Sequence, residues 1–188
     1  MRIEIIKQFV TDEEARLLND FVLDCVKKGL FENGRASKHL NADGTHMVSR
    51  FNKELKYPEV AYVLKQRIMN FFGLKEEDTF SMFNQSGLAV NCTFKDGQLW
   101  EHLDARQNDK SLLRCTVVTS QPTIGGIFHV EKKPVILEDN DLYACLVSEH
   151  QHFCTKNEDD KPRIVWQFGF NVNKEDWNSG KIKVNNDD

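Results

Sequence analysis

The chain has 188 residues, of which 40% are hydrophobic and 29% charged, and its formal net charge is −4 at pH 7. This length and composition are those of one globular domain with a real hydrophobic core. The charge does not indicate a nucleic-acid-binding protein, which usually carries a basic surplus, although a local basic patch stays open. No stretch reaches the roughly 18 apolar residues of a membrane span, and the N-terminus does not begin like a signal peptide.

The cysteines are odd in number and show no Cys-x-x-Cys spacing. Without a secretory signal, such cysteines are typical of reduced thiols rather than of a disulfide framework. We therefore expect a cytoplasmic protein. The cysteines are Cys25, Cys92, Cys115, Cys145 and Cys154.

The N-terminal segment predicts a strand followed by a helix. Residues 2–7 alternate between polar and apolar side chains, as strands do. Thr11 and Glu14 then have the spacing of a capping box, which begins a helix that we expect to stop at Gly29. One face of this helix is apolar and carries Leu18, Phe21, Val22, Cys25 and Val26.

A second helix is predicted from Pro58, which suits the first helical position, to Gly73. Residues 31–55, between the two helices, are polar and indicate a long loop or a loose hairpin. The residues that we expect this second helix to bury are Val60, Leu64, Ile68, Phe71 and Phe72.

From residue 79 the sequence changes to short apolar runs separated by Gly, Asn, Asp or Pro. Such runs are typical of a sandwich or jelly-roll barrel. We predict an α+β fold in a single domain over residues 1–188, with a double-stranded β-helix (jelly-roll) core at about 79–172. Helical support from 1–75 should cover one outer face, and 173–188 should form a polar tail. The predicted strands are 79–83, 88–94, 111–119, 126–131, 134–138, 142–148 and 163–172.

The last predicted strand alternates clearly between two faces. Its apolar face should meet the helices and comprises Ile164, Trp166, Phe168 and Phe170. The opposite face would turn Arg163 and Gln167 into the barrel. A buried arginine is costly unless it meets an anion, and a bound dicarboxylate is an anion that arginine matches well. The alternative is that Arg163 stands at a solvent-exposed rim.

His102-Leu103-Asp104 is a candidate metal-binding segment. Two neutral imidazoles and one carboxylate can hold one face of Fe(II) and leave the opposite positions open. The second imidazole would come from His150 or His152, which strand alternation cannot separate. A Cys154 thiolate would favour a different metal and chemistry. No metal role is assigned to His39, His46 or His129.

Taken together, His102/Asp104, Gly125-Gly126, His152 and Arg163 resemble the signature of the Fe(II)/2-oxoglutarate-dependent dioxygenases, in particular the small members similar to prolyl 4-hydroxylase. The resemblance covers roughly residues 90 to 172. Related sequences commonly place the distal histidine eleven positions before the basic residue, which selects His152 over His150.

The resemblance implies a site for Fe(II) formed by His102, Asp104 and His152. It also implies that 2-oxoglutarate is the co-substrate, with Arg163 holding its distal carboxylate and Gln167 beside it. O2 would be the oxidant, and ascorbate an optional supporting reductant.

One departure from the family concerns a tyrosine. Similar proteins often have Tyr-x-x-Gly upstream of the His-x-Asp pair, with the phenol assisting 2-oxoglutarate. Here the corresponding run is Phe94-Lys95-Asp96-Gly97, and phenylalanine has no hydroxyl. The resemblance then requires another polar group at this place, for which the sequence offers Gln167, Thr116 or Thr119.

Three hypotheses for function follow. The first, favoured by the resemblance, is an oxygenase that hydroxylates a prolyl or other residue of a peptide or protein. The second is an oxygenase for a small molecule or nucleobase, with the basic stretch around Arg35, Lys38, Arg50 and Lys53 as its entrance. The third is a non-catalytic jelly-roll protein that binds a metal, against which the complete set of four site residues argues.

Overall fold

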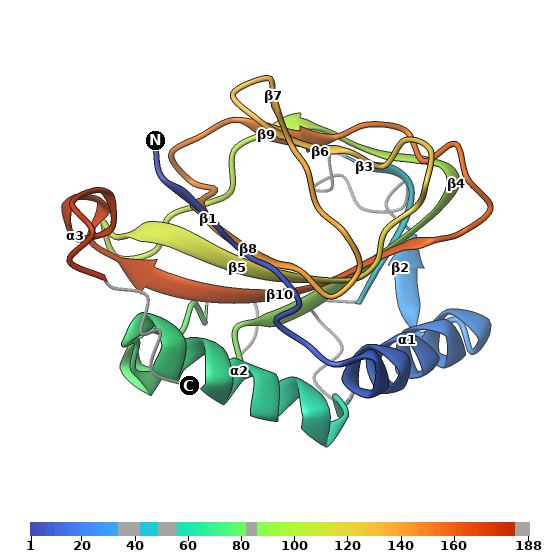
Figure 1. The fold of residues 1–188 in the computed structure, drawn as a ribbon, viewed down its shortest axis with the longest axis horizontal. Helices are drawn as coiled ribbons and strands as arrows, with labels where there is room; N and C mark the ends of the chain where they lie inside the picture. The colour runs from blue at the N-terminus through green and yellow to red at the C-terminus, as the bar shows by residue number, and fades with distance from the viewer. Residues whose placement is uncertain (34–41, 49–55, 82–85, 183–188) are drawn as a thin grey trace.

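The computed structural model describes residues 1–33, 42–48, 56–81 and 86–182. Figure 1 shows these residues arranged in layers, with helices α1 (Asp12–Lys27) and α2 (Glu59–Phe72) below an antiparallel sheet whose far end curls over the top. The fold is therefore α+β with a jelly-roll-like core, as the sequence predicted. A short 3-10 helix, η2 (Glu76–Asp78), follows α2.

The two helices begin and end close to the predicted residues. Thr11 Oγ1 accepts a hydrogen bond from the Glu14 amide at 3.2 Å, and the Glu14 carboxylate accepts one from the Thr11 amide at 2.9 Å. This reciprocal pair is the predicted capping box. Pro58 is the N-cap of α2 and so precedes the first helical residue, and α2 ends at Gly73, which has a φ of 63°.

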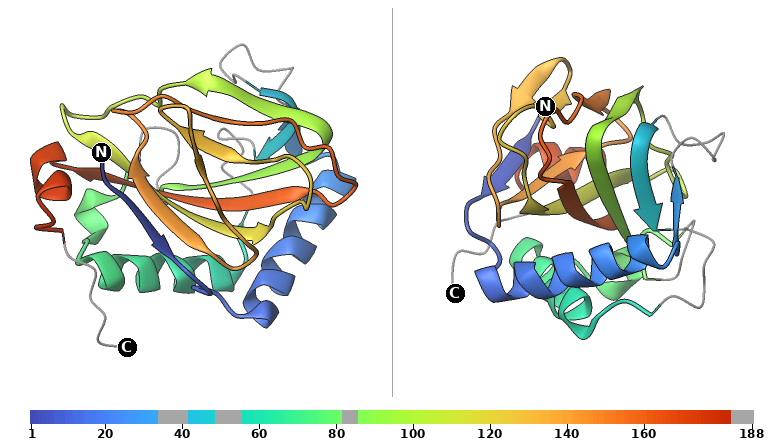
Figure 2. Two further views of the ribbon diagram at one scale, coloured as in Figure 1. Left: turned by 45° about the horizontal axis from the view of Figure 1, so that its top comes forward. Right: turned by 90° about the vertical axis from the view of Figure 1, so that its right-hand side faces the viewer.

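Eight of the described strands form one continuous hydrogen-bonded path with antiparallel neighbours throughout. In spatial order they are β1 (Ile3–Ile6), β8 (Leu142–Leu146), β5 (Ser111–Ser120), β10 (Arg163–Val172), β4 (Leu88–His102), β9 (His152–Cys154), β6 (Phe128–Val130) and β7 (Lys133–Val135). Figure 2 shows how the path bends, so that β9, β6 and β7 face β5 and β10 across the barrel interior.

β2 (Phe31–Asn33) and β3 (Ala42–Val48) pair with each other, and β3 also pairs with β4. The hairpin alternative for 31–55 is therefore correct for the described part of this segment. The basic residues proposed as an entrance, Arg35, Lys38, Arg50 and Lys53, lie outside the described residues.

β10 separates two apolar clusters. Trp166 and Phe168 pack in the cluster that the helices cover, together with Leu18 of α1 and Leu64 of α2. Val165, on the opposite face, packs in the barrel interior with a separate cluster. The alternation predicted for this strand is confirmed, with Ile164 and Phe170 also on the helix side.

Some elements differ from the prediction. β4 continues to His102, well beyond the predicted end at residue 94. In the predicted strand 79–83, Thr79 forms only an isolated bridge to Phe170, and residues 82–85 lie outside the described part. Within 173–188, α3 (Lys174–Asn178) carries Trp177, whose side chain is completely buried.

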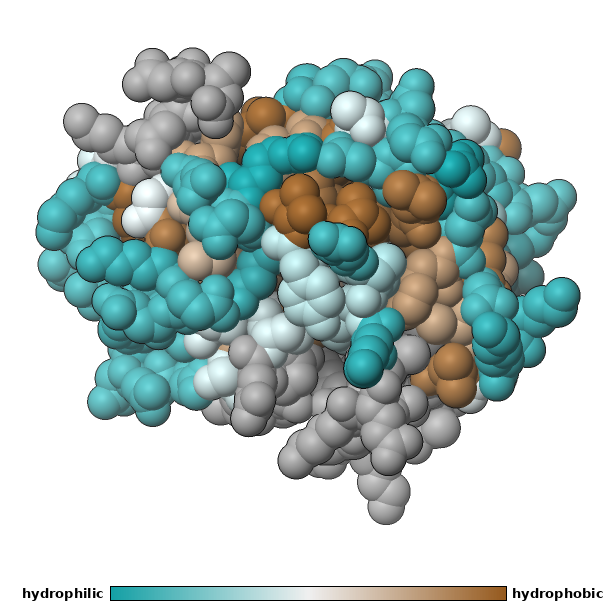
Figure 3. Space-filling view, turned by 90° about the horizontal axis from the view of Figure 1, so that it is seen from below, coloured by the Kyte–Doolittle hydropathy of each residue, from teal (hydrophilic) through white to brown (hydrophobic). Residues whose placement is uncertain are grey.

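On the outer face of the helix layer, polar side chains surround apolar ones that gather near the middle and toward the right of the view (Figure 3). No helix within the described ranges is both long and apolar enough to cross a membrane.

Candidate metal centre

Three side chains of the kind that bind metal ions converge where β4 ends and β9 begins. One ligand atom from each of His102, Asp104 and His152 lies within 4.8 Å of the other two. Nε2 of His102 is 3.4 Å from Oδ1 of Asp104, and the two imidazole centroids are 4.3 Å apart. An ion with bonds of about 2 Å to nitrogen and oxygen can be accommodated between these atoms.

The two imidazoles are oriented by the same local hydrogen bond. Nδ1 of His102 lies 2.7 Å from the carbonyl of Trp100, and Nδ1 of His152 lies 3.1 Å from the carbonyl of His150. Because a carbonyl only accepts, the proton belongs on Nδ1 of each ring, and Nε2 is left with a lone pair for a cation. Burial lowers the pKa of His152 to about 4, so that its imidazole is neutral at neutral pH.

Asp104 is held in place by an arginine. Nη2 of Arg114, on β5, donates to Oδ2 of Asp104 at 2.7 Å, and the Asp104 amide donates to the carbonyl of Val147 at 3.1 Å. Burial by itself would raise the pKa of Asp104, but the charges of Arg114 and His152, together with the hydrogen bonds from His102 and Arg114, outweigh it and hold the pKa well below its ordinary value. The carboxylate is therefore ionised at neutral pH.

A β-bulge sets the direction of His102. Leu99 pairs with Cys154 and His102 pairs with His152, so three steps along β4 match two steps along β9. The extra residue reverses the alternation of β4, which turns His102 toward His152. From strand alternation, the sequence predicted that His102 and Asp104 reach one metal from the same strand end. In the structure only His102 belongs to β4, and Asp104 lies beyond its end.

Arg163 lies deeper in the same barrel. It begins β10, is 5% exposed, and donates from Nε to Oε1 of Gln121 at 3.3 Å. Its Nη2 atom is buried and has no hydrogen-bond partner among the described residues. Burial raises the pKa of the Cys154 thiol, and the charge of Arg163 opposes that rise. Cys154 is two positions along β9 from His152, which places it about 7 Å from that histidine.

Other polar side chains line the barrel beside Arg163. Thr116 of β5 has Tyr143 of β8 on one side and Gln167 of β10 on the other. Burial raises the pKa of Tyr143 to about 12, with the charge of Arg163 opposing the rise. Oδ1 of Asn91, a buried residue on β4, has no hydrogen-bond partner among the described residues. Buried polar atoms without partners point to a bound molecule or water.

The Gly125-Gly126 turn packs against the stem of Arg163. Both glycines have positive φ, at 73° and 62°. A Cβ atom on Gly125 would come within 2.1 Å of the Lys156 carbonyl oxygen, and one on Gly126 within 2.5 Å of Pro122. Both positions therefore require glycine, because of the backbone conformation and because of the close approach.

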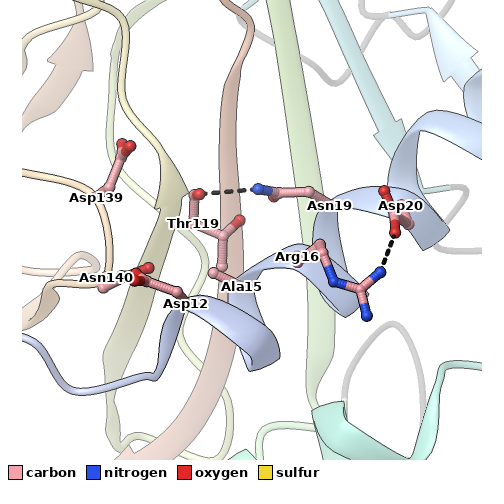
Figure 4. Close-up of a pocket in the computed structure, with 8 residues that line it drawn as sticks. All are labelled: Asp12, Ala15, Arg16, Asn19, Asp20, Thr119, Asp139 and Asn140. Atoms are coloured by element: carbon pink, nitrogen blue, oxygen red, sulfur yellow. Dashed lines mark hydrogen bonds and ion pairs between the residues drawn. The ribbon is translucent and has the colours of Figure 1, made fainter.

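Phe94 does not face the barrel. It packs against the helix-side cluster, and so its missing hydroxyl leaves no gap in the interior. Thr119 also lies on the outer side. It lines an open pocket of about 370 Å³ beside α1, where Nδ2 of Asn19 donates to its carbonyl at 2.9 Å (Figure 4). Of the three suggested substitutes, only Thr116 and Gln167 belong to the barrel.

Among the other histidines, the two whose side chains are described, His129 and His150, have other partners. Nδ1 of His150 lies 3.5 Å from a carboxylate oxygen of Glu131, and His129 stacks on Phe153 at 4.5 Å. His39 lies outside the described residues, and nothing is described of the His46 side chain.

Two further polar residues of the site, Arg114 and Tyr143, were not predicted from the sequence. Arg114 could have been found, because it is the one charged residue in the apolar run of residues 112–118. A charge in such a strand indicates a buried partner of opposite sign. Tyr143 carries no comparable signal, since tyrosine is common in buried strands.

No family model matches the sequence, and no curated protein matches it. The structure, in contrast, is similar to solved prolyl hydroxylases. A Pseudomonas putida prolyl-4-hydroxylase aligns with a TM-score of 0.64 at 13% identity, over 90% of this chain and 92% of that one. A viral collagen prolyl hydroxylase from Paramecium bursaria Chlorella virus-1, solved as a 2-oxoglutarate complex, aligns with a TM-score of 0.60 at 16% identity, over 92% and 97%.

A third similar structure is a prolyl hydroxylase from Trichoplax adhaerens, solved with a peptide fragment of the oxygen degradation domain of hypoxia inducible factor. It aligns with a TM-score of 0.67 at 14% identity, over 90% of this chain and 83% of that chain. At such low identities these likenesses establish the fold that the chain shares with these proteins.

Proposed function

We propose that the protein is an Fe(II)- and 2-oxoglutarate-dependent dioxygenase that hydroxylates a C–H bond in a prolyl or other residue of a peptide or protein. One observation carries the proposal. The ligand atoms of His102, Asp104 and His152 lie within 4.8 Å of one another, in the same barrel as the buried guanidinium of Arg163.

The donor set suits Fe(II). Two neutral imidazoles with one ionised carboxylate are the ligands of the facial triad, which leaves open positions on the metal. In this role Nε2 of His102 and His152 and one oxygen of Asp104 would hold the ion. Bound iron would supply the chemistry that combines O2, 2-oxoglutarate and a C–H bond to give succinate, CO2 and an alcohol.

The interior also suits a dicarboxylate. Arg163 has an unpaired buried nitrogen, which fits a charge-assisted bond to the distal carboxylate of 2-oxoglutarate. The Tyr143 phenol and the Thr116 hydroxyl lie on neighbouring strands beside it, and both can donate to the same carboxylate. Gln167 is proposed as a further contact. Tyr143 then takes the part that the resemblance assigned to a tyrosine at position 94.

The peptide substrate is supported by the known structures that share the fold. One of these is a collagen prolyl hydroxylase, and another was solved with a peptide fragment. At the mouth of the site, Trp100 and Leu103 flank His102 and are 52% and 51% exposed. Exposed apolar side chains beside a metal centre offer a surface on which an extended peptide can lie.

The experiment is an oxygenase assay on a library of proline-containing peptides, with nucleosides and common metabolites as a second panel. The enzyme is incubated with Fe(II), 2-oxoglutarate, ascorbate and O2. Succinate is then quantified, and each panel is searched by mass spectrometry for the gain of one oxygen atom. We expect the wild-type enzyme to give a peptide that has gained one oxygen atom, and the Asp104→Ala variant to give no such product.

The other outcomes decide between the remaining hypotheses. Succinate stimulated by a nucleoside or metabolite, with no peptide product, would favour the small-molecule oxygenase. Binding of Fe(II) without any turnover of 2-oxoglutarate would favour a non-catalytic metal-binding protein.

We place this reaction in the cytoplasm. All of the cysteines are free and buried, including those whose thiols lie next to the metal site and Arg163, namely Cys145 and Cys154. Free thiols and Fe(II) are both maintained in a reducing compartment. Cell fractionation with an antibody to the native protein tests this, and recovery in a secreted fraction would contradict it.

A further inference from the structure

We propose that Arg114 is a positioning residue that makes Asp104 bind the metal through one oxygen only. This inference rests on the proposed function, because it assigns a task within the same metal site. Nη2 of Arg114 donates to Oδ2 of Asp104 at 2.7 Å. The other oxygen, Oδ1, is the one that faces Nε2 of His102 at 3.4 Å. The two oxygens of the carboxylate thus have separate partners.

The division matters for how many positions the metal keeps free. An ion held by two imidazoles and one carboxylate oxygen retains open positions for co-substrate and O2. A carboxylate that turned to bind through both oxygens would take one of these positions. By occupying Oδ2, the guanidinium leaves Oδ1 as the available donor.

The surroundings of Arg114 make it a rigid support. The residue is 6% exposed and lies in the middle of β5, paired with Cys145 on β8 and Gly169 on β10. A Cβ atom on Gly169 would lie 3.4 Å from Nη1 of Arg114 and 3.0 Å from Cβ of Phe80. Because position 169 has no side chain, the guanidinium can lie against the backbone of β10. The planar fork of arginine then fixes the direction of its bond to Asp104.

Two simpler roles make different predictions. If Arg114 acted only through its charge, removing that charge would tighten the binding of a divalent cation, and lysine would replace arginine without effect. If Arg114 served only the fold, its variants would lower the stability of the metal-free protein and leave the folded site unchanged.

The test uses Co(II) alone as the probe, because its visible absorption reports coordination number as well as affinity. The variants are Arg114→Lys, which keeps the charge but loses the fork, and Arg114→Met, which loses both. Arg106→Met is the matched control, since Arg106 is also close to Asp104 in sequence but pairs with Glu149 at 2.6 Å. Circular dichroism confirms that each variant is folded.

We expect the Kd for Co(II) to rise about ten- to a hundredfold in Arg114→Lys, as for other residues that orient metal ligands. Its absorption bands should weaken, because a second carboxylate oxygen joins the metal. Wild type and Arg106→Met should share one spectrum and one Kd. If Arg114→Met does not fold, the lysine variant still decides the question.

An unchanged Kd and spectrum in Arg114→Lys would overturn the positioning role and leave the proposed function standing. If Arg114→Met bound Co(II) more tightly and Arg114→Lys had the wild-type Kd, the effect of Arg114 would be that of its charge alone, and the positioning role would be wrong. Failure of the wild-type protein to bind Co(II) would overturn the metal site, and this inference with it.

Discussion

His150 and His152 are two residues apart and equivalent by strand alternation, yet their surroundings differ. His152 is 5% exposed and its ring lies against that of His102. His150 points to Glu131 and contributes to the site through its backbone carbonyl, which accepts from Nδ1 of His152. A residue that contributes to the site only through its backbone carbonyl can have its side chain replaced without loss of the site.

We therefore predict that His152→Ala abolishes Fe(II)-dependent decarboxylation of 2-oxoglutarate, as do His102→Ala and Asp104→Ala. His150→Ala should keep most of the activity, because its carbonyl is retained. The measurement is succinate release under O2 in a matched set of folded variants. Activity that survives in His152→Ala would show that the ligand is another residue, and equal loss in both variants would leave His150 as an equal candidate.

A second prediction concerns the affinity for the co-substrate. Arg163→Ala removes a charge-assisted bond worth about 1.5–3 kcal/mol, so the KM for 2-oxoglutarate should rise roughly ten- to a hundredfold. Binding of Mn(II), followed by electron paramagnetic resonance, should change little. Lys161→Ala is the control, since this nearby cation pairs with Asp139 on the surface. A KM that stays at the wild-type value in Arg163→Ala would mean that the anchor is elsewhere.

At the scale of single elements, the structure was predicted best from the sequence where one strand or helix has two chemically different faces. β10 is such a case, because its aromatic residues meet the helices while Arg163 and Gln167 turn inward. The helices were equally clear, since caps and apolar spacing are local signals.

Elements that depend on distant partners could not be predicted. Residues 95–98 are polar and do not look like a strand, yet β4 continues through them because β3 and β9 pair with its second half. α3 is too short to show a helical period. For the site, the residue types and their order were readable, and Arg114 could be recognised as a buried charge, whereas its pairing with Asp104 and the outward direction of Phe94 required the folded chain.

The capping box of α1 gives a prediction for stability. Thr11→Ala removes the side-chain oxygen that accepts from the Glu14 amide, and should lower the free energy of unfolding by about 1 kcal/mol. Thr11→Ser keeps that oxygen and should cost less. Urea unfolding followed by circular dichroism measures both. A serine variant as unstable as the alanine variant would show that the hydroxyl is not the cause.

At the scale of the whole molecule, we expect the metal and the co-substrate to stabilise the fold. The side chains that would bind them come from β4, β5, β9 and β10 and the segments that follow these strands. At a hundred times Kd, a ligand of the native state contributes about 2.7 kcal/mol, or roughly 5–10 °C in Tm for a chain of this size. Calorimetry with Mn(II) and 2-oxoglutarate tests this. The gain should disappear with a chelator and be absent in Asp104→Ala, and an equal gain in that variant would contradict specific binding.

The bulge between Leu99 and His102 accommodates one residue more on β4 than on β9. Deleting Glu101, for instance, would keep His102-Leu103-Asp104 intact in the sequence and leave two steps along β4 against two along β9. Regular pairing would then return with the imidazole still on the side of His152, because residues two apart on a strand share a face. Among homologous chains, metal-binding members can therefore differ by one residue in this short interval, with β4 bulged in some and regular in others.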